Sequence, residues 1–342
     1  MDPPTLNKQT NAAVEVVPSF HEYDGTYCAV VLVKERFKVD RRGRVARTED
    51  AEVRIADELW DPDAPDASSI KYPSDLCQNK PSTDVIVVGE AIPPGRQPVP
   101  QMQVELRAGP VHKILQVFGP RAWYDAVGRL ALTKPEPFES MPIRWERAFG
   151  GADYETDPDR PLEEPRNPCG RGLVADPDEL LGTEGPNIEL PGDRVESQRS
   201  RPAPAGFGPI GRNFEPRRNY SGTFDELWME ERMPLLPLDF DQRFHQVAPP
   251  DQVTREPLRG GETVEVTGMH AEGRVLFQLP RLRFFIGVRD LEGLTEHPPQ
   301  IDTLLLEPND RAFEMTWRSL VPLPRESSRL RYVQVNEKRL VR

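Results

Sequence analysis

Cysteine and histidine are scarce in this sequence of 342 residues, which has three cysteines and five histidines. An odd and widely spaced set of cysteines matches neither a disulfide framework nor a zinc site, so we predict free thiols in a reducing cytosol. No two histidines have the spacing of a metal site. The sequence therefore predicts a protein that needs neither a metal nor another cofactor. The residues concerned are Cys28, Cys77, Cys169, His21, His112, His245, His270 and His297.

Long apolar runs and an excess of positive charge are also missing. No run approaches the ~20 apolar residues of a membrane helix, and Met1 to Pro4 show no feature of a signal peptide. The net charge of −12 argues against binding to nucleic acid, which needs clustered lysine and arginine, and against docking on anionic lipid. We therefore expect a soluble cytoplasmic protein whose acidic surface serves solubility.

Catalytic motifs are scarce as well, with no Gly-x-Ser-x-Gly elbow and no phosphate-binding loop. Gly206–Gly211 matches the glycine spacing of dinucleotide sites, but no strand precedes it, so we interpret it as a loop. Asp239 and Asp241 place two carboxylates on one side of an extended segment, close to His245 in the sequence. An enzyme built from these three residues is one alternative; carboxylates that cap turns or pair with Arg243 are the other.

Proline, by contrast, is abundant: 38 prolines and 24 glycines predict many loops and few long helices, because proline breaks helix interiors. Short runs rich in β-branched residues predict strands. These runs are 27–33, 36–39, 84–89, 303–306, 312–317 and 331–335, whereas residues 1–13 are polar and we expect them to be frayed. We predict a mainly β fold with few short helices.

Two stretches share a hairpin pattern. Residues 103–107 alternate polar and apolar, turn at a glycine and return over 111–121; residues 262–267 and 274–281 repeat this pattern. We hypothesise two related, sandwich-like β-sheet modules within a single family domain spanning residues 1–342. The submodules would be an N-terminal β module (14–133), a central insertion (134–257) and a C-terminal β module (258–342). The alternative is that any two amphipathic hairpins look alike.

The central insertion is rich in proline, arginine and glycine but also in aromatic residues, which are unusual in disordered segments. We predict an ordered, mostly irregular segment with one short helix from Thr223, as its cap, to Arg232. Its arginines either satisfy backbone carbonyls within the insertion or form a surface with the aromatics that anchors a partner. These arginines are Arg144, Arg147, Arg166, Arg171, Arg201, Arg212, Arg217 and Arg218.

An ordered series of motifs runs through the chain: Trp145–Gly151, Asn167–Gly172, Pro186–Glu189, Pro204–Ile210, Gly222–Glu226, Leu236–Asp241, Ala248–Gln252 and Arg259–Glu262. The series resembles the bacterial domain-of-unknown-function 2169 family over about residues 20–290. Phe214 stands where the family pattern has a tryptophan, and Ala271 where it has a proline.

The resemblance implies a role in type VI secretion. Members of the family are similar to cytosolic adaptors or chaperones that stabilise a toxic effector and help mount it, through a PAAR tip domain, on the VgrG spike. No catalytic residue is carried over, and we expect a protein that is not an enzyme. The alternatives are an enzyme with a site in the central insertion, or a structural component of a secretion or phage-like apparatus. Candidate partner contacts are Trp145, Arg147, Arg212, Asp239, Asp241 and Phe244.

Overall fold

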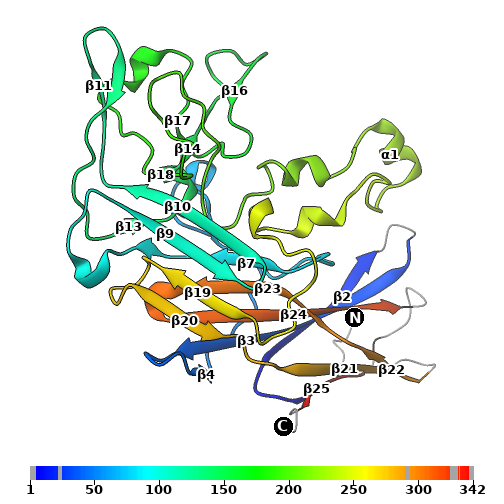
Figure 1. Ribbon diagram of the computed structural model, residues 1–342. Helices are drawn as coiled ribbons and strands as arrows, with labels where there is room; N and C mark the ends of the chain where they lie inside the picture. The colour runs from blue at the N-terminus through cyan, green and yellow to red at the C-terminus, as the bar shows by residue number, and fades with distance from the viewer. Residues whose placement is uncertain (1–4, 22–24, 290–292, 324–329, 331, 339–342) are drawn as a thin grey trace.

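The predicted β fold is confirmed by a computed structural model that describes residues 5–21, 25–289, 293–323, 330 and 332–338 (Figure 1). These residues contain 25 β-strands and one α-helix, together with eight short 3-10 helices. Residue 331 of the predicted strand 331–335 lies outside the described residues. None of the helices in the described ranges has the length and apolar character needed to cross a membrane.

The largest sheet has six strands. Five follow the order β2-β3-β24-β23-β7, and the sixth, β4, also pairs with β3. Its centre is the antiparallel pair of β3 and β24, which runs in register from Ala312 opposite Lys38 to Leu323 opposite Tyr27. The predicted strands at 27–39, 84–89, 303–306 and 312–317 all lie in this sheet. The bounds are β2 (Ala13–His21), β3 (Tyr27–Val39), β4 (Val45–Arg47), β7 (Asp84–Val87), β23 (Gln300–Glu307) and β24 (Ala312–Leu323).

A second sheet contains both predicted hairpins, in the order β18-β10-β9-β19-β20. In the first hairpin Gly109 takes a φ of 55° at the turn between β9 and β10, a backbone region that suits glycine. The hairpins meet where β9 pairs antiparallel with β19. The strands are β9 (Gln101–Ala108), β10 (Val111–Phe118), β18 (Ile188–Glu189), β19 (Thr263–Thr267) and β20 (Arg274–Gln278).

A third sheet, of four strands, joins the two ends of the chain in the order β1-β25-β21-β22. The polar β1 pairs parallel with β25 over five residues, so our expectation of frayed residues 1–13 is wrong for this segment. Backbone pairing with β25, together with a hydrogen bond from the side chain of Asn7 to the hydroxyl of Tyr332, orders β1. The strands are β1 (Thr5–Gln9), β21 (Arg283–Arg289), β22 (Leu294–His297) and β25 (Tyr332–Lys338).

The three sheets pack around one apolar core. Phe313 of β24 stacks on Phe37 of β3 and on Phe277 of β20, with ring centroids 4.8 Å and 4.6 Å apart. Trp317 of β24 meets Phe284 of β21 edge-on at 4.9 Å. The six-stranded and five-stranded sheets each combine strands from segments 14–133 and 258–342, so these two segments do not form one separate module each. Alternation in the sequence predicts which face of a strand is buried, but not which strand pairs with it.

The opposite face of the six-stranded sheet is also covered, and it carries charges. Lys34 of β3 and Glu314 of β24 are 1% and 4% exposed, and their charged groups lie 3.1 Å apart. Segment 50–80 covers them. Its Arg54 lies 2.5 Å from the carboxylate of Glu314, and its Asp75 lies 2.7 Å from the ammonium group of Lys34. The covering segment includes η1 (Pro65–Ala67) and the strands β5 (Glu58–Leu59) and β6 (Ile70–Tyr72).

The central insertion is mostly irregular, as predicted, and its upper part stands above β10 and β9 in Figure 1. Its helix α1 spans Glu226–Glu231. The N-cap is Asp225, whose side chain accepts from the backbone N–H of Trp228, and not Thr223 as we predicted. The remaining short elements are β8 (Glu90–Ala91), η2 (Pro94–Arg96), β11 (Trp123–Asp125), β12 (Leu130–Leu132), β13 (Met141–Pro142), η3 (Trp145–Arg147), β14 (Phe149–Gly150), β15 (Ala152–Asp153), β16 (Leu162–Glu163), β17 (Arg171–Gly172), η4 (Pro177–Leu180), η5 (Arg217–Tyr220), η6 (Gln242–His245), η7 (Pro250–Gln252) and η8 (Pro308–Asp310).

Candidate partner-binding surface

Trp145, a predicted partner contact, is a core residue of the central insertion. Its side chain is 4% exposed, and its indole N–H donates to the carbonyl of Pro209 at 2.9 Å. Phe214 meets the ring edge-on at 6.2 Å. A Cβ at Gly206 would lie 3.1 Å from the ring, which explains why a glycine stands there. Trp145 therefore stabilises the insertion and is not a surface contact, because its only polar atom is used internally.

Arg147 lies half-buried in η3 and holds two segments of the insertion together. Its guanidinium donates to the side-chain oxygen of Asn187 at 3.2 Å, and its carbonyl accepts from the backbone N–H of the same residue at 2.7 Å. Burial lowers the pKa of Arg147, and the neighbouring charges of Arg171 and Arg144 lower it further. The carboxylates of Glu184 and Glu146 oppose this effect, so Arg147 lies among charges of both signs.

Other arginines of the insertion bind backbone carbonyls. Arg217 is 5% exposed and donates to the carbonyls of Ile210 at 2.6 Å and Phe244 at 3.0 Å. Arg171 donates to the carbonyl of Glu146 at 2.7 Å. These bonds agree with the structural interpretation of the arginines, because an irregular backbone leaves carbonyls that no sheet satisfies.

Arg212 is exposed, in contrast to these arginines. It lines a groove of ≈ 410 Å³ between segment 57–70 and the central insertion. Tyr154, which is 55% exposed, and the acidic Asp57 and Asp66 line the same groove. Arg212 is thus accessible to a partner, at a surface of mixed charge.

The two predicted carboxylates serve separate turns. Asp239 accepts from the backbone N–H and the hydroxyl of Thr223 at 2.9 Å and 2.7 Å. Asp241 caps η6 by accepting from the backbone N–H of Arg243 at 2.9 Å and also pairs with its guanidinium. The turn-capping interpretation is therefore confirmed, and this geometry does not favour an acid–base pair.

Phe244 and His245 pack into an aromatic cluster with Phe240. The half-buried Phe244 ring lies 5.6 Å from Phe240, and His245 lies 5.5 Å from Phe240. Burial, followed by the charges of Arg318 and Lys80, lowers the pKa of His245 to about 3. An imidazole with this pKa stays neutral near pH 7 and is poorly suited to general acid–base catalysis, which works best with a pKa near the working pH.

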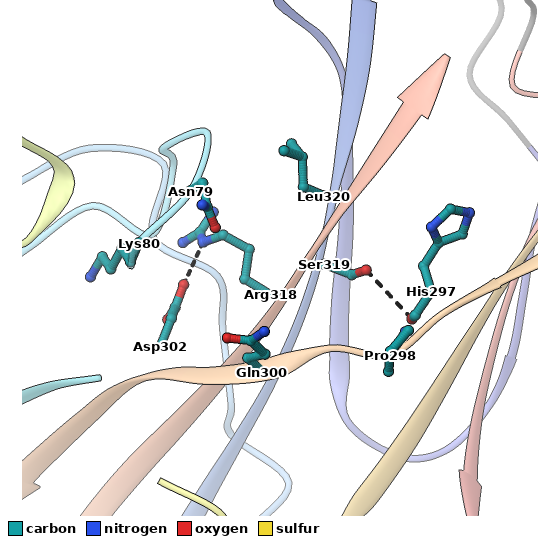
Figure 2. A pocket seen from close by; sticks show the side chains of 9 residues that line it. All are labelled: Asn79, Lys80, His297, Pro298, Gln300, Asp302, Arg318, Ser319 and Leu320. Atoms are coloured by element: carbon teal, nitrogen blue, oxygen red, sulfur yellow. Dashed lines mark hydrogen bonds and ion pairs between the residues drawn. The ribbon is translucent and has the colours of Figure 1, made fainter. Parts of the chain in front are cut away.

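A polar pocket of ≈ 200 Å³ lies close to these cations, at the edge of the six-stranded sheet (Figure 2). Arg318 of β24 points toward Asp302 of β23 and forms an ion pair with it. Lys80 pairs with Asp84 at 2.9 Å and donates to Thr303 at 2.8 Å. Both cations of this pocket thus pair with carboxylates of the protein itself, which are Asp302 and Asp84.

The four most exposed large apolar side chains in the described part of the insertion lie around α1. In this region the sequence pointed to a short helix and to Asp239, but to none of these side chains. We define the α1 lobe as residues 222–239; it lies at the upper right of Figure 1, and its Leu235 approaches Gly25, just before β3. Its exposed apolar residues are Phe224 (54%), Leu227 (60%), Met229 (61%), Met233 (62%) and Leu238 (78%). The sequence carried a signal, because Leu227, Trp228 and Met229 are consecutive and lie about 100° apart around a helix, so one buried stripe cannot cover all three.

The α1 lobe is anchored at both ends. The backbone N–H of Asp241 donates to the carbonyl of Tyr220 at 3.0 Å, so the chain leaves the lobe beside the point where it enters. Within the lobe the half-buried Trp228 donates its indole N–H to the carbonyl of Leu235 at 2.9 Å. The lobe thus presents its apolar side chains on an ordered base.

The motif series suggested a bacterial family, and the chain matches one family model over most of its length. The model described as "Uncharacterized protein conserved in bacteria (DUF2169)" matches residues 24–318. No curated protein and no solved structure matches the chain. Since the match covers most of the chain, including the central insertion and the α1 lobe, the chain belongs to the DUF2169 family of bacterial proteins.

Proposed function

We propose that this protein is a cytoplasmic adaptor, or chaperone, that binds and stabilises a type VI secretion effector linked to a PAAR domain and helps to load it on the VgrG spike. Two lines of support combine. The motif series carries the resemblance to such adaptors, and the α1 lobe offers a surface for binding another protein.

The observation that carries the proposal is the exposure of the α1 lobe. Five large apolar side chains within fifteen residues are each more than half exposed. Soluble proteins rarely leave such groups of apolar side chains in water unless a partner covers them. Methionines and aromatic rings are also typical anchors of protein interfaces, and methionine adapts its shape to different partners.

An adaptor must hold its client before secretion and release it at the spike. A small projecting lobe suits this task, because an interface of moderate area can form and separate, whereas a large apolar interface is obligate. The three sheets supply the rigid support, and the exposed Arg212 provides a second, polar contact region beside the groove described above.

A clean deletion of the gene in the native host tests the function. We expect a lower level or poorer delivery of one effector, while the secretion tube still assembles. Unchanged effector level and unchanged killing of competitor cells would contradict the adaptor proposal. Loss of all tube assembly would instead support a structural component of the apparatus.

Complementation adds a matched test of the α1 lobe. The wild-type gene should restore effector delivery, and a variant in which a short glycine–serine linker replaces residues 222–239 should not. The chain enters and leaves the lobe at adjacent positions, so the replacement should leave the sheets folded. Co-purification of effector with wild type and with this variant gives the corresponding binding measurement.

A further inference from the structure

The α1 lobe combines its apolar side chains with a strong local negative charge. Residues 222–239 contain Asp225, Glu226, Glu230, Glu231 and Asp239, against Arg232 as the one base, which gives 1 − 5 = −4. All five carboxylates are exposed. The guanidinium of Arg232 donates to the carbonyl of Leu236 at 2.6 Å, so it is used in part within the lobe itself.

Helix geometry arranges these groups around α1. Successive residues are about 100° apart around a helix. Because Trp228 packs toward the body of the lobe, Leu227 and Met229 lie on its two sides. Glu226 and Glu230, four residues apart, share the face opposite Trp228. A surface that approaches α1 from the outside therefore meets apolar flanks and a carboxylate ridge together.

We propose that the α1 lobe docks on a basic amphipathic segment of the client, in which apolar side chains are bordered by lysine and arginine. This inference rests on the proposed function, and it specifies the chemistry of the client at the binding surface. Apolar contacts with Leu227, Met229 and Met233 supply the affinity. The carboxylates steer a cationic segment toward the lobe and disfavour an acidic one, since like charges at an interface cost free energy.

The same charge disfavours two other occupants. A second copy of the chain would bring another lobe of charge −4, on a protein of net charge −12, against the first. The cytoplasmic face of a membrane presents anionic lipid, which the carboxylates of Glu226 and Glu230 repel. A cationic protein segment therefore complements both properties of the lobe.

Binding of synthetic peptides to the full-length protein tests the inference, with fluorescence anisotropy as the measurement. The first probe is an amphipathic helix of leucine and lysine. The second has the same pattern with glutamate in place of lysine, and the third is a lysine–serine peptide without an apolar face. We expect the leucine–lysine peptide to bind at least about tenfold more tightly than either of the others, with an affinity that falls as salt is raised.

Two variants and two matched controls locate the site. The apolar variant combines Leu227→Ser with Met229→Ser, and the carboxylate variant combines Glu226→Gln, Glu230→Gln and Glu231→Gln. All five residues are exposed, so folding should persist.

The matched controls lie outside the lobe and are also exposed. The apolar control combines Tyr124→Ser with Leu181→Ser, and the carboxylate control combines Glu136→Gln, Glu139→Gln and Glu155→Gln. We expect about tenfold weaker peptide binding for the apolar variant, and for the carboxylate variant a smaller loss that vanishes at high salt. The controls should stay within about twofold of wild type.

Several results would overturn the inference. The first two are that the leucine–lysine peptide does not bind wild type, or that the leucine–glutamate peptide binds as tightly as the leucine–lysine peptide. The third is that the lobe variants and the control variants lose the same amount of peptide affinity. The fourth is that wild type is a dimer which the apolar variant converts to a monomer. An effector that co-purifies normally with both lobe variants would remove this docking surface and leave the adaptor function standing. Lobe-dependent peptide binding, together with unchanged effector delivery in the deletion strain, would remove the adaptor function instead.

Discussion

At the scale of single residues, Glu314 is the centre of the charges buried beneath segment 50–80. Its carboxylate lies 2.8 Å from Arg36, 2.5 Å from Arg54 and 3.1 Å from Lys34. Burial by itself would raise the pKa of Glu314, but the hydrogen bond from Arg54 and the charge of Lys34 outweigh burial and lower the pKa to about 2. The group thus stays charged in the folded protein, whereas it protonates near pH ~4.3 in an unfolded chain.

The variant Glu314→Gln should lower the free energy of unfolding by about 3–5 kcal/mol at pH 7, because the buried cations lose their shared carboxylate. Chemical denaturation measures this change. The exposed pair of Arg259 and Glu256, with side chains 84% and 81% accessible, provides the control: Glu256→Gln should change the free energy by less than about 1 kcal/mol. Equal effects of the two substitutions would show that the charges under segment 50–80 do not stabilise the fold.

His245 should make the protein less stable as the pH falls below about 6.5. Its folded-state pKa is about 3, while an unfolded histidine titrates near ~6.5. Between these values the unfolded chain binds the additional proton, so stability rises with pH and is lost as pH falls. Glu314 adds to this loss only below about pH 4.5, because its own pKa is lowered.

The variant His245→Phe should therefore lose less stability than wild type between pH 6.5 and pH 5, the window in which carboxylates are still charged. Thermal unfolding over a pH series measures the slope. His112→Phe is the control, because His112 is exposed and bonds only to Glu105 among the contacts described. If His245→Phe keeps the wild-type slope, the histidine is not held neutral in the folded protein.

At the scale of elements, η3 and the loop at 204–210 form one unit through Trp145. The ring packs on Gly206 and Phe214, and its N–H bonds to the loop carbonyl of Pro209. Two motifs that are separated by more than fifty residues in the sequence thus describe one packing contact. The motif glycines act first as determinants of the fold.

Replacing Trp145 with alanine should lower the free energy of unfolding by about 3–5 kcal/mol, since a large buried ring and its hydrogen bond are lost together. The exposed Arg212→Ala should change it by less than about 0.5 kcal/mol. Denaturation of both variants measures the contrast. A small effect at Trp145 would return this residue to the candidate partner contacts.

At the scale of the whole molecule, strands from near the start of the described chain pair with strands from near its end. β3 and β24 are separated by more than 270 residues and share the longest ladder of the largest sheet, while β1 pairs with β25. Pairings between segments so far apart in the sequence slow folding, because a long loop must close before the contacts stabilise it. The fold therefore depends on both ends of the described chain.

Neither segment 14–133 nor segment 258–342 should fold when produced alone. Each would expose strand edges that the other covers, such as the edge of β3 that binds β24 and the edge of β9 that binds β19. Far-UV circular dichroism with thermal unfolding checks the prediction: the full chain should unfold cooperatively and the fragments should not. A cooperative transition in either fragment would support two independent β modules.

The sequence by itself determined the features that depend on local order. β-branched runs and abundant proline predicted the strands and the scarcity of helix; Thr223, Glu226 and Pro234 predicted the short helix that contains α1; and the ordered motifs identified the family. These signals are local because strand alternation and helix capping act between residues close in the chain.

Only the tertiary structure decided which strands pair, which charges meet and which aromatic rings are covered. Trp145 and Phe224 are both aromatic residues of one proline-rich insertion, yet the first is 4% exposed and the second 54%. Trp145 was predicted to lie at the surface, whereas Asp239 was the one predicted contact in the α1 lobe and none of the lobe's exposed apolar side chains was predicted, because burial depends on which distant segment covers a side chain. The free energy gained by burying a side chain depends on the tertiary packing around it, and a local sequence pattern does not predict that packing.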